Sequence, residues 1–333
     1  MKNIDITPII DKIANVVANH KLAPGCYKRF PEDDFPNPYG CADAANILYT
    51  IGKLPREDSE REAFVRTLRD MQDPITGLFI EKPSDPTKFV HNPVHTTAHC
   101  MAALELFDKA PLHRAKELEK YLQYDNMCEL FESFDWRTTP GTPAHIGAGL
   151  YAALNLGGSD CREFNKNYFR WLWDNTDPDT GMIRLGCQDG QMLIWHHMAV
   201  TFHFLFNMEH AHIPIRYPDK LIDACIDMYR NESMETFGKT AKFVEMDWVY
   251  CLTRCMQQTP HRHDEIIEVL EDFAEMYIHE HWLTADYDTN RNINDMHELF
   301  GGVCALAELQ RALRGKLYSD IPLKLVLDRR PFI

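Results

Sequence analysis

A chain of 333 residues, 45% of them hydrophobic and 26% charged, has the composition of a globular protein with a large core. Its 35 Lys and Arg residues against 50 Asp and Glu residues give a formal net charge of −15 at pH 7, and no segment is rich in Lys and Arg. We therefore expect neither nucleic acid nor a membrane as a partner, because both attract clustered positive charge.

The first 17 residues predict an amphipathic helix, because acids are interspersed among their apolar side chains. They lack the apolar core of a signal peptide, and no apolar run long enough to span a membrane follows. The ten cysteines include no Cys-x-x-Cys pair. Five of them lie in apolar, helix-like runs: Cys100, Cys225, Cys251, Cys255 and Cys304. We expect free thiols and a cytoplasmic protein.

Two kinds of helical segment alternate along the chain. Six charge-rich segments show the i, i+3, i+4 apolar spacing of surface helices: 6–20, 58–72, 112–123, 160–174, 218–231 and 263–281. Six intervening segments are rich in Ala, Gly, Cys, Leu and Met and carry few charges, which indicates helices buried on all sides. The sequence therefore predicts an all-α protein of twelve helices.

A repeat of about 51 residues connects the six apolar segments. The stretches 92–106 and 142–156 align on Pro-x-His and on Ala-Ala-Leu, which pairs His95 with His145. Similar steps of 50 or 52 residues give one polar residue near the start of each apolar segment. We call these six residues the repeat heads: Asp43, His95, His145, His197, Asp247 and His297.

Long irregular stretches precede the apolar segments, whereas short connectors follow them. The long stretches are 21–39, 73–92, 124–141, 175–194, 232–243 and 282–294. Loops of this length in a compact domain are usually functional. Two of them share a turn signature, DPITGLF at 73–79 and DPDTGMI at 177–183.

This alternation resembles an (α/α)6 toroid, the fold of six-hairpin glycosidases, several polysaccharide lyases, terpenoid cyclases and protein prenyltransferases. The resemblance covers about residues 6–313 and implies a single domain over 1–333. The expected hairpins are 6–54, 58–108, 112–156, 160–210, 218–258 and 263–313. A tail over 314–333 is expected to pack on the outside. An open α-solenoid that serves as a binding scaffold is the alternative.

In a closed ring, the N-termini of the inner helices would open onto one cavity with their partial positive charges. Asp43 and Asp247 also fit an ordinary N-cap role. No capping preference favours histidine, so the four histidine heads indicate a functional cavity. We expect the local field to lower their pKa values, which leaves neutral imidazoles suited to proton transfer, hydrogen bonding or metal binding.

Hydrolysis of a glycosidic bond needs two carboxyl groups, and elimination needs a base such as a neutral histidine. Our candidates for catalysis are Asp43, His95, Asp135, His145 and Asp247. Our candidates for substrate binding are Tyr39, His99, Trp136, Arg137, Trp195, His196, His197, Trp248, His297 and Glu298. The loop arginines best able to clamp a substrate carboxylate are Arg137, Arg184 and Arg291.

His91, His95 and His99 are spaced by four residues, and a His-x3-His pair on a helix can bind zinc. Closing such a site needs a further ligand, which His145 or Asp43 would supply only if the ring brings it near. We expect no cofactor and keep zinc as the alternative.

The preferred interpretation is a carbohydrate-active enzyme, of glycoside hydrolase or lyase type, that acts on a small oligosaccharide, with acidic sugars among the candidates. Aromatic side chains stack on sugar rings and carboxylates bind hydroxyls. One alternative is an isoprenoid cyclase or prenyltransferase-like enzyme. Residues 95–100, HTTAHC, are similar to the His-Thr-x-x-Cys segment of prenyltransferase β-subunits, whose histidine binds zinc. The other alternative is a non-enzymatic scaffold that binds a ligand or protein.

Overall fold

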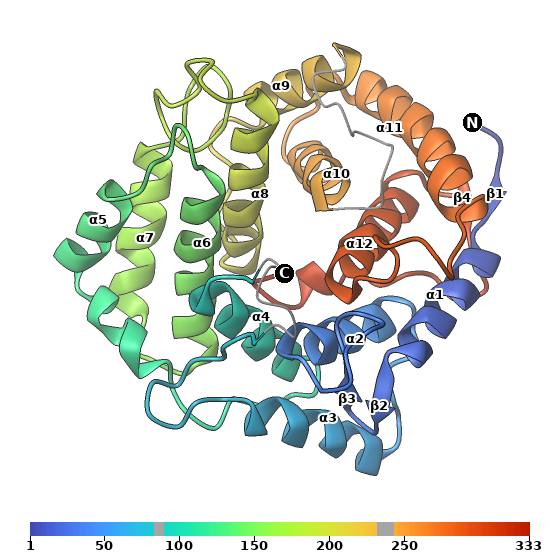
Figure 1. Cartoon of the computed structure of the whole chain (residues 1–333). Coiled ribbons are helices and arrows are strands. Elements are labelled where there is room, and N and C mark those ends of the chain that lie inside the picture. The colour runs from blue at the N-terminus through green and yellow to red at the C-terminus, as the bar shows by residue number, and fades with distance from the viewer. Residues whose placement is uncertain (83–89, 232–242) are drawn as a thin grey trace.

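The computed structural model describes residues 1–82, 90–231 and 243–333. Twelve α-helices lie in these residues, together with short 3-10 and π segments and four very short strands, which confirms the all-α prediction (Figure 1). Most of the predicted loop 232–243 lies outside the described residues, as do residues 83–89 of the predicted loop 73–92.

Six helices form the outer layer and bury one face each. They are α1 (Thr7–Asn19), α3 (Asp58–Asp70), α5 (Tyr124–Glu132), α7 (Arg162–Asp174), α9 (Pro218–Arg230) and α11 (His263–Tyr277), which a π-helical segment, η2 (Ile278–Leu283), extends. In α1 the buried residues are Ile9, Ile10, Ile13, Val16 and Val17. This spacing places them on a single stripe that faces the core.

The other six helices form the inner layer and are buried on almost every side. They are α2 (Pro38–Thr50), α4 (Pro93–Glu105), α6 (Gly141–Leu156), α8 (Ile194–His210), α10 (Phe243–Cys255) and α12 (Met296–Ala312). Each inner helix packs on the next one in the sequence, and α12 packs on α2 (Figure 1). The small and apolar residues that dominate these helices allow this close packing on several neighbours.

The third outer helix differs from the prediction. A helix was expected over 112–123, but a 3-10 segment, η1 (Lys116–Leu122), stands there and α5 follows within the expected loop. Leu118 is the buried residue of η1, whereas α5 buries Met127 and Phe131 one helical turn apart. The apolar spacing that stabilises a surface helix therefore begins after the charge-rich stretch.

Two small two-stranded sheets accompany the helices. Strand β1 (Ile4–Asp5) pairs in parallel with β4 (Leu317–Tyr318), which joins the chain before α1 to the chain after α12. Strands β2 (Lys21–Ala23) and β3 (Cys26–Tyr27) form an antiparallel hairpin.

The two turns that share the D-P-x-T-G signature have the same structure. Asp73 accepts hydrogen bonds from the backbone of Thr76 and Ile75. In the second turn, Asp177 accepts from the backbone of Asp179 and Thr180 in the same way. The glycines of both turns have positive φ values, +77° and +71°, which glycine adopts without strain.

Each turn is attached to the following inner helix by the same hydrogen bond. The backbone N–H of Phe79 donates to Thr97 Oγ1, and that of Ile183 donates to Thr201 Oγ1, both at 2.9 Å. The two turns and the two threonines are all 104 residues apart in the sequence. The turns therefore fix the alignment of α4 with α8.

The first part of the C-terminal segment 314–333 lies at the surface as predicted, but its last residues do not, and for them the prediction is wrong. Residues beyond η3 (Val326–Asp328) enter the space between the inner helices, as the position of the C-terminus in Figure 1 shows. Phe332 and Ile333 are fully buried, and the Phe332 ring lies 4.8 Å from the His95 ring. The segment enters because its apolar side chains fill space that the six inner helices leave between them.

The inner helices α2, α4 and α12 are capped by residues that precede the repeat heads. Asn37 accepts hydrogen bonds from two backbone N–H groups of α2, Asn92 accepts one at α4, and Asp295 accepts one at α12. Asp43 lies more than one turn inside α2, and Asp247 lies one turn inside α10. The N-cap interpretation of these two aspartates is therefore wrong.

Replacement of Asn37 by alanine is expected to lower the free energy of unfolding by about 1–2 kcal/mol. The buried Asn37 side chain caps α2 and also donates to Glu81 at 3.3 Å, so both interactions are lost. Urea titration would measure the change. Asn92→Ala is the matched control, since the exposed Asn92 accepts one capping bond, and equal losses in the two variants would contradict this account.

All ten cysteines are free thiols. The five that were expected in apolar helical surroundings are buried, which confirms that prediction. None of the helices in the described part of the chain combines the length and the apolar character needed to cross a bilayer.

Candidate active site

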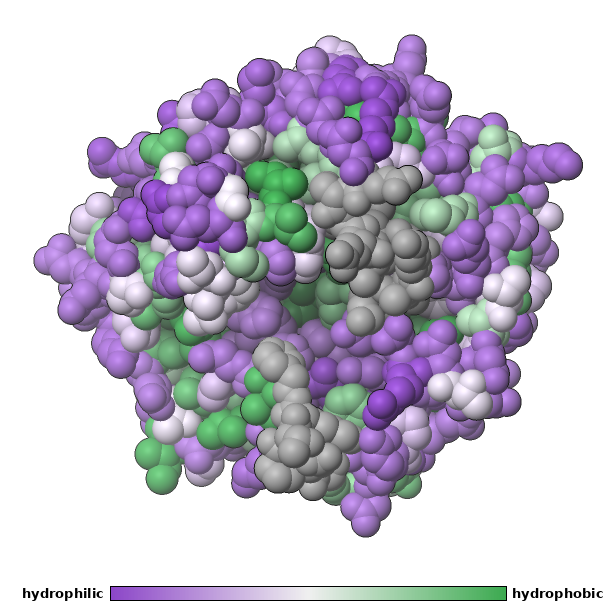
Figure 2. Space-filling model, turned by 45° about the horizontal axis from the view of Figure 1, so that its top comes forward, coloured by the Kyte–Doolittle hydropathy of each residue, from purple (hydrophilic) through white to green (hydrophobic). Residues whose placement is uncertain are grey.

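A pocket of about 320 Å³ lies where the first turns of five inner helices meet. Its walls come from the chain at the start of α4, α6, α8, α10 and α12, with Arg29 from the loop before α2 and Ile333 from the C-terminal segment. The surface in Figure 2 is hollowed near the middle of the face shown, with hydrophilic residues around much of the hollow. The name "the pocket" is used from here on for the pocket of about 320 Å³.

Four of the six repeat heads line the pocket: His95, His145, Asp247 and His297. A fifth, Asp43, lies directly behind His297. The sixth, His197, is not part of the lining, and neither of its ring nitrogens has a hydrogen-bond partner among the described residues.

The pocket side of α8 instead carries His196, Ala199, Val200 and His203. The 104-residue step fixed by the two turns pairs His99 with His203 and His95 with Ala199. The sequence repeat had paired His95 with His197, which is two residues earlier. Two residues rotate a side chain by about 200° around an α-helix, so the predicted head points away from the pocket.

Asp43 links two histidines behind the pocket wall. Its Oδ1 accepts a hydrogen bond from His99 Nε2 at 2.7 Å, and its Oδ2 accepts one from His297 Nδ1 at 3.2 Å. Burial raises the pKa of Asp43, although the positive charge of Arg29 acts in the opposite direction. Burial also lowers the pKa values of His99 and His297, so both imidazoles are neutral at pH 7.

Tyr39 holds a row of histidines in place. Its hydroxyl is 2.6 Å from His95 Nδ1, and its ring stacks on those of His91 and His99 at centroid distances of 4.3 and 5.0 Å. Tyr39 is fully buried and is not part of the pocket lining. Its contacts therefore make it a positioning residue for His95.

His95, His145 and His203 form a compact cluster at the pocket, and one ring nitrogen from each lies within 4.8 Å of the others. The rings of His95 and His145 have centroids 4.6 Å apart, and those of His145 and His203 are 5.4 Å apart. Burial lowers the pKa of all three imidazoles, to about 4 in His203. The expected lowering at the histidine heads is confirmed in direction, with burial as its main cause.

Arg29 is the arginine at the pocket among the described residues, and the sequence did not point to it. It is buried and ion-paired with Glu81 at 2.8 Å and with Asp295 at 2.9 Å. Burial opposes ionisation of Glu81, but the hydrogen bond from His91 and the charge of Arg29 lower its pKa to about 2. Two carboxylates therefore already neutralise this guanidinium.

Two carboxyl groups on neighbouring helices line the pocket. Asp247 comes from α10 and Glu298 from the first turn of α12. Asp247 is 3% exposed, and its Oδ1 has no hydrogen-bond partner in the described part of the chain. Burial raises the pKa of Asp247, and the negative charges of Glu245 and Glu298 raise it further. The surroundings of Asp247 therefore favour the protonated form of its carboxyl group.

One of the three tryptophans nominated for sugar stacking lies at the pocket. Trp195 is half-buried, and its ring stacks on His196 with a centroid separation of 3.6 Å. Trp136 and Trp248 lie in the core, where each indole N–H donates to a backbone carbonyl at 2.8 Å. Only Trp195 of the three is positioned to contact a ligand in the pocket.

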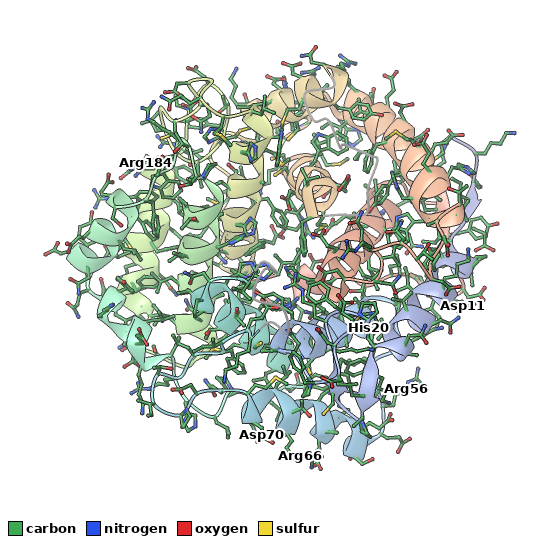
Figure 3. All side chains as sticks on the ribbon, viewed as in Figure 1. Asp11, His20, Arg56, Arg66, Asp70 and Arg184 are labelled. Atoms are coloured by element: carbon green, nitrogen blue, oxygen red, sulfur yellow. The ribbon has the colours of Figure 1, made fainter. Side chains whose placement is uncertain are left out.

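The residues nominated from the loop before α6 lie outside the pocket. Asp135 is at the surface, where it accepts hydrogen bonds from the backbone of Arg137 and Thr138. Arg137 is ion-paired with Asp189. Arg184 is paired with Glu132 at 2.7 Å and lies at the periphery (Figure 3). Neither Arg137 nor Arg184 reaches the pocket, whereas Arg291 lines a neighbouring one.

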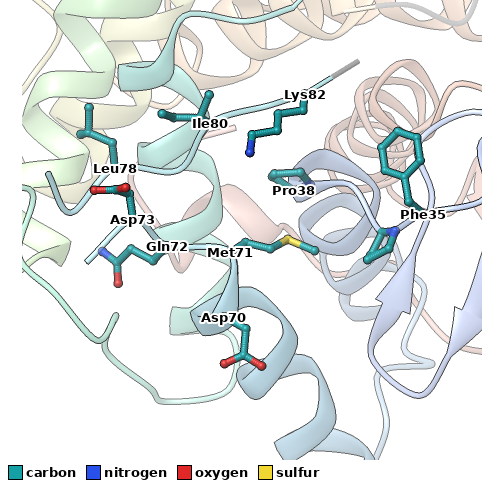
Figure 4. Close-up of a pocket in the computed structure, with 10 residues that line it drawn as sticks. Phe35, Pro38, Asp70, Met71, Gln72, Asp73, Leu78, Ile80 and Lys82 are labelled. Atoms are coloured by element: carbon teal, nitrogen blue, oxygen red, sulfur yellow. The ribbon is translucent and has the colours of Figure 1, made fainter. Parts of the chain in front are cut away.

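That neighbouring pocket, of about 640 Å³, shares Arg29 and Glu298 with the first and extends over residues 288–295. A further pocket of about 400 Å³ lies beside the D-P-x-T-G turn after α3 (Figure 4). Its lining combines Asp70 and Asp73 with Lys82 and apolar side chains, and it contains none of the residues nominated from the sequence.

Comparison of the chain with protein-family models, with curated proteins and with solved structures gives no match.

Proposed function

We propose that this chain is a carbohydrate-active enzyme of the glycoside hydrolase type, built as an (α/α)6 toroid, that cleaves a small oligosaccharide in the pocket. The contacts between successive inner helices, and between α12 and α2, support the toroid. The chemistry of the pocket lining supports the reaction class.

The observation that carries the proposal is the pair of carboxyl groups from α10 and α12. Hydrolysis of a glycosidic bond needs a carboxylic acid that protonates the departing oxygen and a carboxylate that acts on the opposite side of the bond. These two groups must have different pKa values. Asp247, with its raised pKa, fits the acid, and Glu298 fits the carboxylate.

The steps follow from these roles. Asp247 transfers its proton to the glycosidic oxygen as the bond from that oxygen to the anomeric carbon breaks. Glu298 either removes a proton from the attacking water or forms a transient ester with the anomeric carbon, which water then hydrolyses. Water enters the products in both cases, and Asp247 regains a proton before the next cycle.

The pocket favours a neutral sugar over an acidic one. Trp195 offers a half-buried aromatic face on which a sugar ring stacks. The charge of Arg29 is already compensated by Glu81 and Asp295, so it is poorly suited to bind a uronate. The neutral imidazoles around the pocket supply hydrogen-bond donors and acceptors for hydroxyl groups.

The proposal is tested with a panel of nitrophenyl glycosides and short neutral oligosaccharides. We expect the products to contain one added water, detected by mass. The variant Glu298→Gln is expected to lower kcat by at least about 100-fold, because the second carboxylate is lost.

Asp135→Asn is the matched control, since it removes one negative charge from an exposed aspartate outside the pocket and should leave activity unchanged. Products that absorb in the ultraviolet through a new double bond and contain no added water would show elimination and contradict hydrolysis. Full activity in Glu298→Gln would also contradict it.

A further inference from the structure

We propose that His95, His145 and His203 bind a divalent transition-metal ion of the zinc class at the edge of the pocket. This site does not depend on the proposed function, because it rests on three imidazoles and not on the carboxyl pair. The expectation of no cofactor is therefore replaced by a specific ligand set.

The three side chains converge from three helices. His95 comes from α4, His145 from α6 and His203 from α8, which pack on one another in this order. Their ligand nitrogens lie within 4.8 Å of one another. Zinc–nitrogen bonds of about 2.0–2.1 Å would require only a modest inward movement of the three rings.

The hydrogen bonds around two of the rings orient them for metal binding. His203 Nδ1 donates to the Ala199 carbonyl at 2.8 Å, which leaves the lone pair of Nε2 available. His95 Nδ1 is 2.6 Å from the hydroxyl of Tyr39, and the lone pair of Nε2 is available in the tautomer in which Nδ1 donates to that oxygen. Metal-binding histidines typically donate their other ring N–H to an oxygen, which fixes both the tautomer and the orientation of the ring.

The chemical state of the cluster also suits a cation. Three imidazoles this close repel one another when they take up a second proton and become positively charged, so the arrangement favours the neutral rings. Neutral imidazole is the form that binds zinc, copper, nickel and cobalt. All three side chains line the pocket, so a fourth coordination position faces it and remains open to water or substrate.

A second group, Asp43, His99 and His297, also has its ligand atoms within 4.8 Å of one another. There the Asp43 side chain is already hydrogen-bonded to each histidine, at 2.7 and 3.2 Å. These hydrogen bonds would have to break before an ion could bind. We therefore assign the ion to the three histidines and the second group to internal hydrogen bonding.

The test uses the full-length protein after treatment with a chelator and dialysis. Titration with Zn²⁺, followed by calorimetry, is expected to show one ion bound per chain. Co²⁺ is expected to give visible absorption bands of a four- or five-coordinate site, which Zn²⁺ then displaces. In crystals soaked with Zn²⁺, the anomalous peak should lie between the three imidazoles.

His145→Ala and His203→Ala are expected to lower the affinity for Zn²⁺ by more than about 100-fold, because loss of a ligand exceeds the 10–100-fold effect of losing an outer partner. Tyr39→Phe keeps all three ligands and removes the oxygen beside His95 Nδ1. We expect it to weaken binding by about tenfold or more. His145 is not fully buried, so His145→Ala should retain the fold, which circular dichroism checks.

His261→Ala is the matched control, because His261 pairs with Asp223 at the surface and lies outside the cluster. His99→Ala separates the two candidate groups. Three outcomes would overturn the proposal: no stoichiometric ion in the wild-type protein, unchanged affinity in folded His145→Ala and His203→Ala, or loss of the ion in His99→Ala alone.

Discussion

Replacement of Asp247 by asparagine is expected to reduce kcat for an oligosaccharide by about 10²–10⁴-fold, with little change in KM. The amide has nearly the same size and remains in the pocket, but it cannot transfer a proton to the departing oxygen. The measurement is steady-state kinetics on a substrate identified in the glycoside panel.

Substrates with different leaving groups separate this role from a structural one. A dinitrophenyl glycoside releases a stable anion and needs no protonation, so Asp247→Asn should cleave it at a rate close to that of the wild type. Glu298→Gln should be slow on both substrates, because its carboxylate is needed whatever the leaving group. Equal losses on both substrates in Asp247→Asn would show that Asp247 does not act as the acid.

The pH profile gives an independent readout. Burial raises the pKa of Asp247, so the acid form persists to a higher pH than in an exposed aspartate. Activity is therefore expected to fall as the pH rises through this raised pKa. Asp247→Asn should lose that alkaline limb. Retention of the limb in the variant would assign it to another group.

The second large effect concerns the stability of the packing between α10, α12 and the C-terminal segment. Arg254 of α10 is ion-paired with Glu308 of α12, and both side chains are at least 96% buried. Arg254 also pairs with Asp328 of the C-terminal segment at 2.7 Å. We expect Arg254→Met to lower the free energy of unfolding by about 3–5 kcal/mol at pH 7, because Glu308 is left buried without its cation.

The double variant Arg254→Met with Glu308→Met is the control for this interpretation. It removes both buried charges and replaces them with apolar side chains of similar size, so its loss should be much smaller than that of Arg254→Met alone. Asp328 stays half-exposed and solvated in both variants. Losses of equal size in the single and double variants would show that packing, and not the unpaired charge, controls the effect.

The stability difference between Arg254→Met and the wild type should also depend on pH. Burial raises the pKa of Glu308 in the folded chain, and removal of Arg254 takes away the interaction that opposes this rise. In the unfolded chain Glu308 ionises near the ordinary pKa of glutamate, so below that pH the variant loses no stability through an unpaired charge. This loss of stability grows as the pH rises toward the folded-state pKa of Glu308 and is complete above it. Chemical denaturation at several pH values measures this.

The helical architecture could be predicted because it depends on local patterns. The apolar spacing of the outer segments and the apolar composition of the inner ones are visible in the sequence, and α1, α3, α7 and α9 follow the expected ranges within two residues. The charge-rich stretch 112–123 predicts the third outer helix in the wrong place, because the apolar spacing that stabilises this helix lies at 127–131.

The side chains of the site were predicted in part. Similarity of sequence placed His95, His145, Asp247 and His297 at corresponding points of four repeats, and all four line the pocket. For α8, matching histidine with histidine selected His197. The D-P-x-T-G turns have a spacing of 104 residues instead, and this spacing pairs His99 with His203. The repeated turn is visible in the sequence and could have identified His203.

Other features had no local signal. Arg29, Glu81 and Asp295 come from three loops and meet only because the packing of the whole chain brings these loops together. The burial of Phe332 beside His95 depends on the space that several helices leave between them, which no segment of the sequence encodes alone. Such long-range relations arise from the whole packing arrangement.

The contact between α12 and α2 has a consequence for synthesis on the ribosome. Hairpins emerge in order, and each inner helix can dock on the one made just before it. The first of them, α2, has to wait until α12 has been translated, about 250 residues later, before its second flank is covered. During elongation the nascent chain therefore carries an uncovered apolar flank on α2 and another on the inner helix made last, and these flanks are the surfaces on which a chaperone would act.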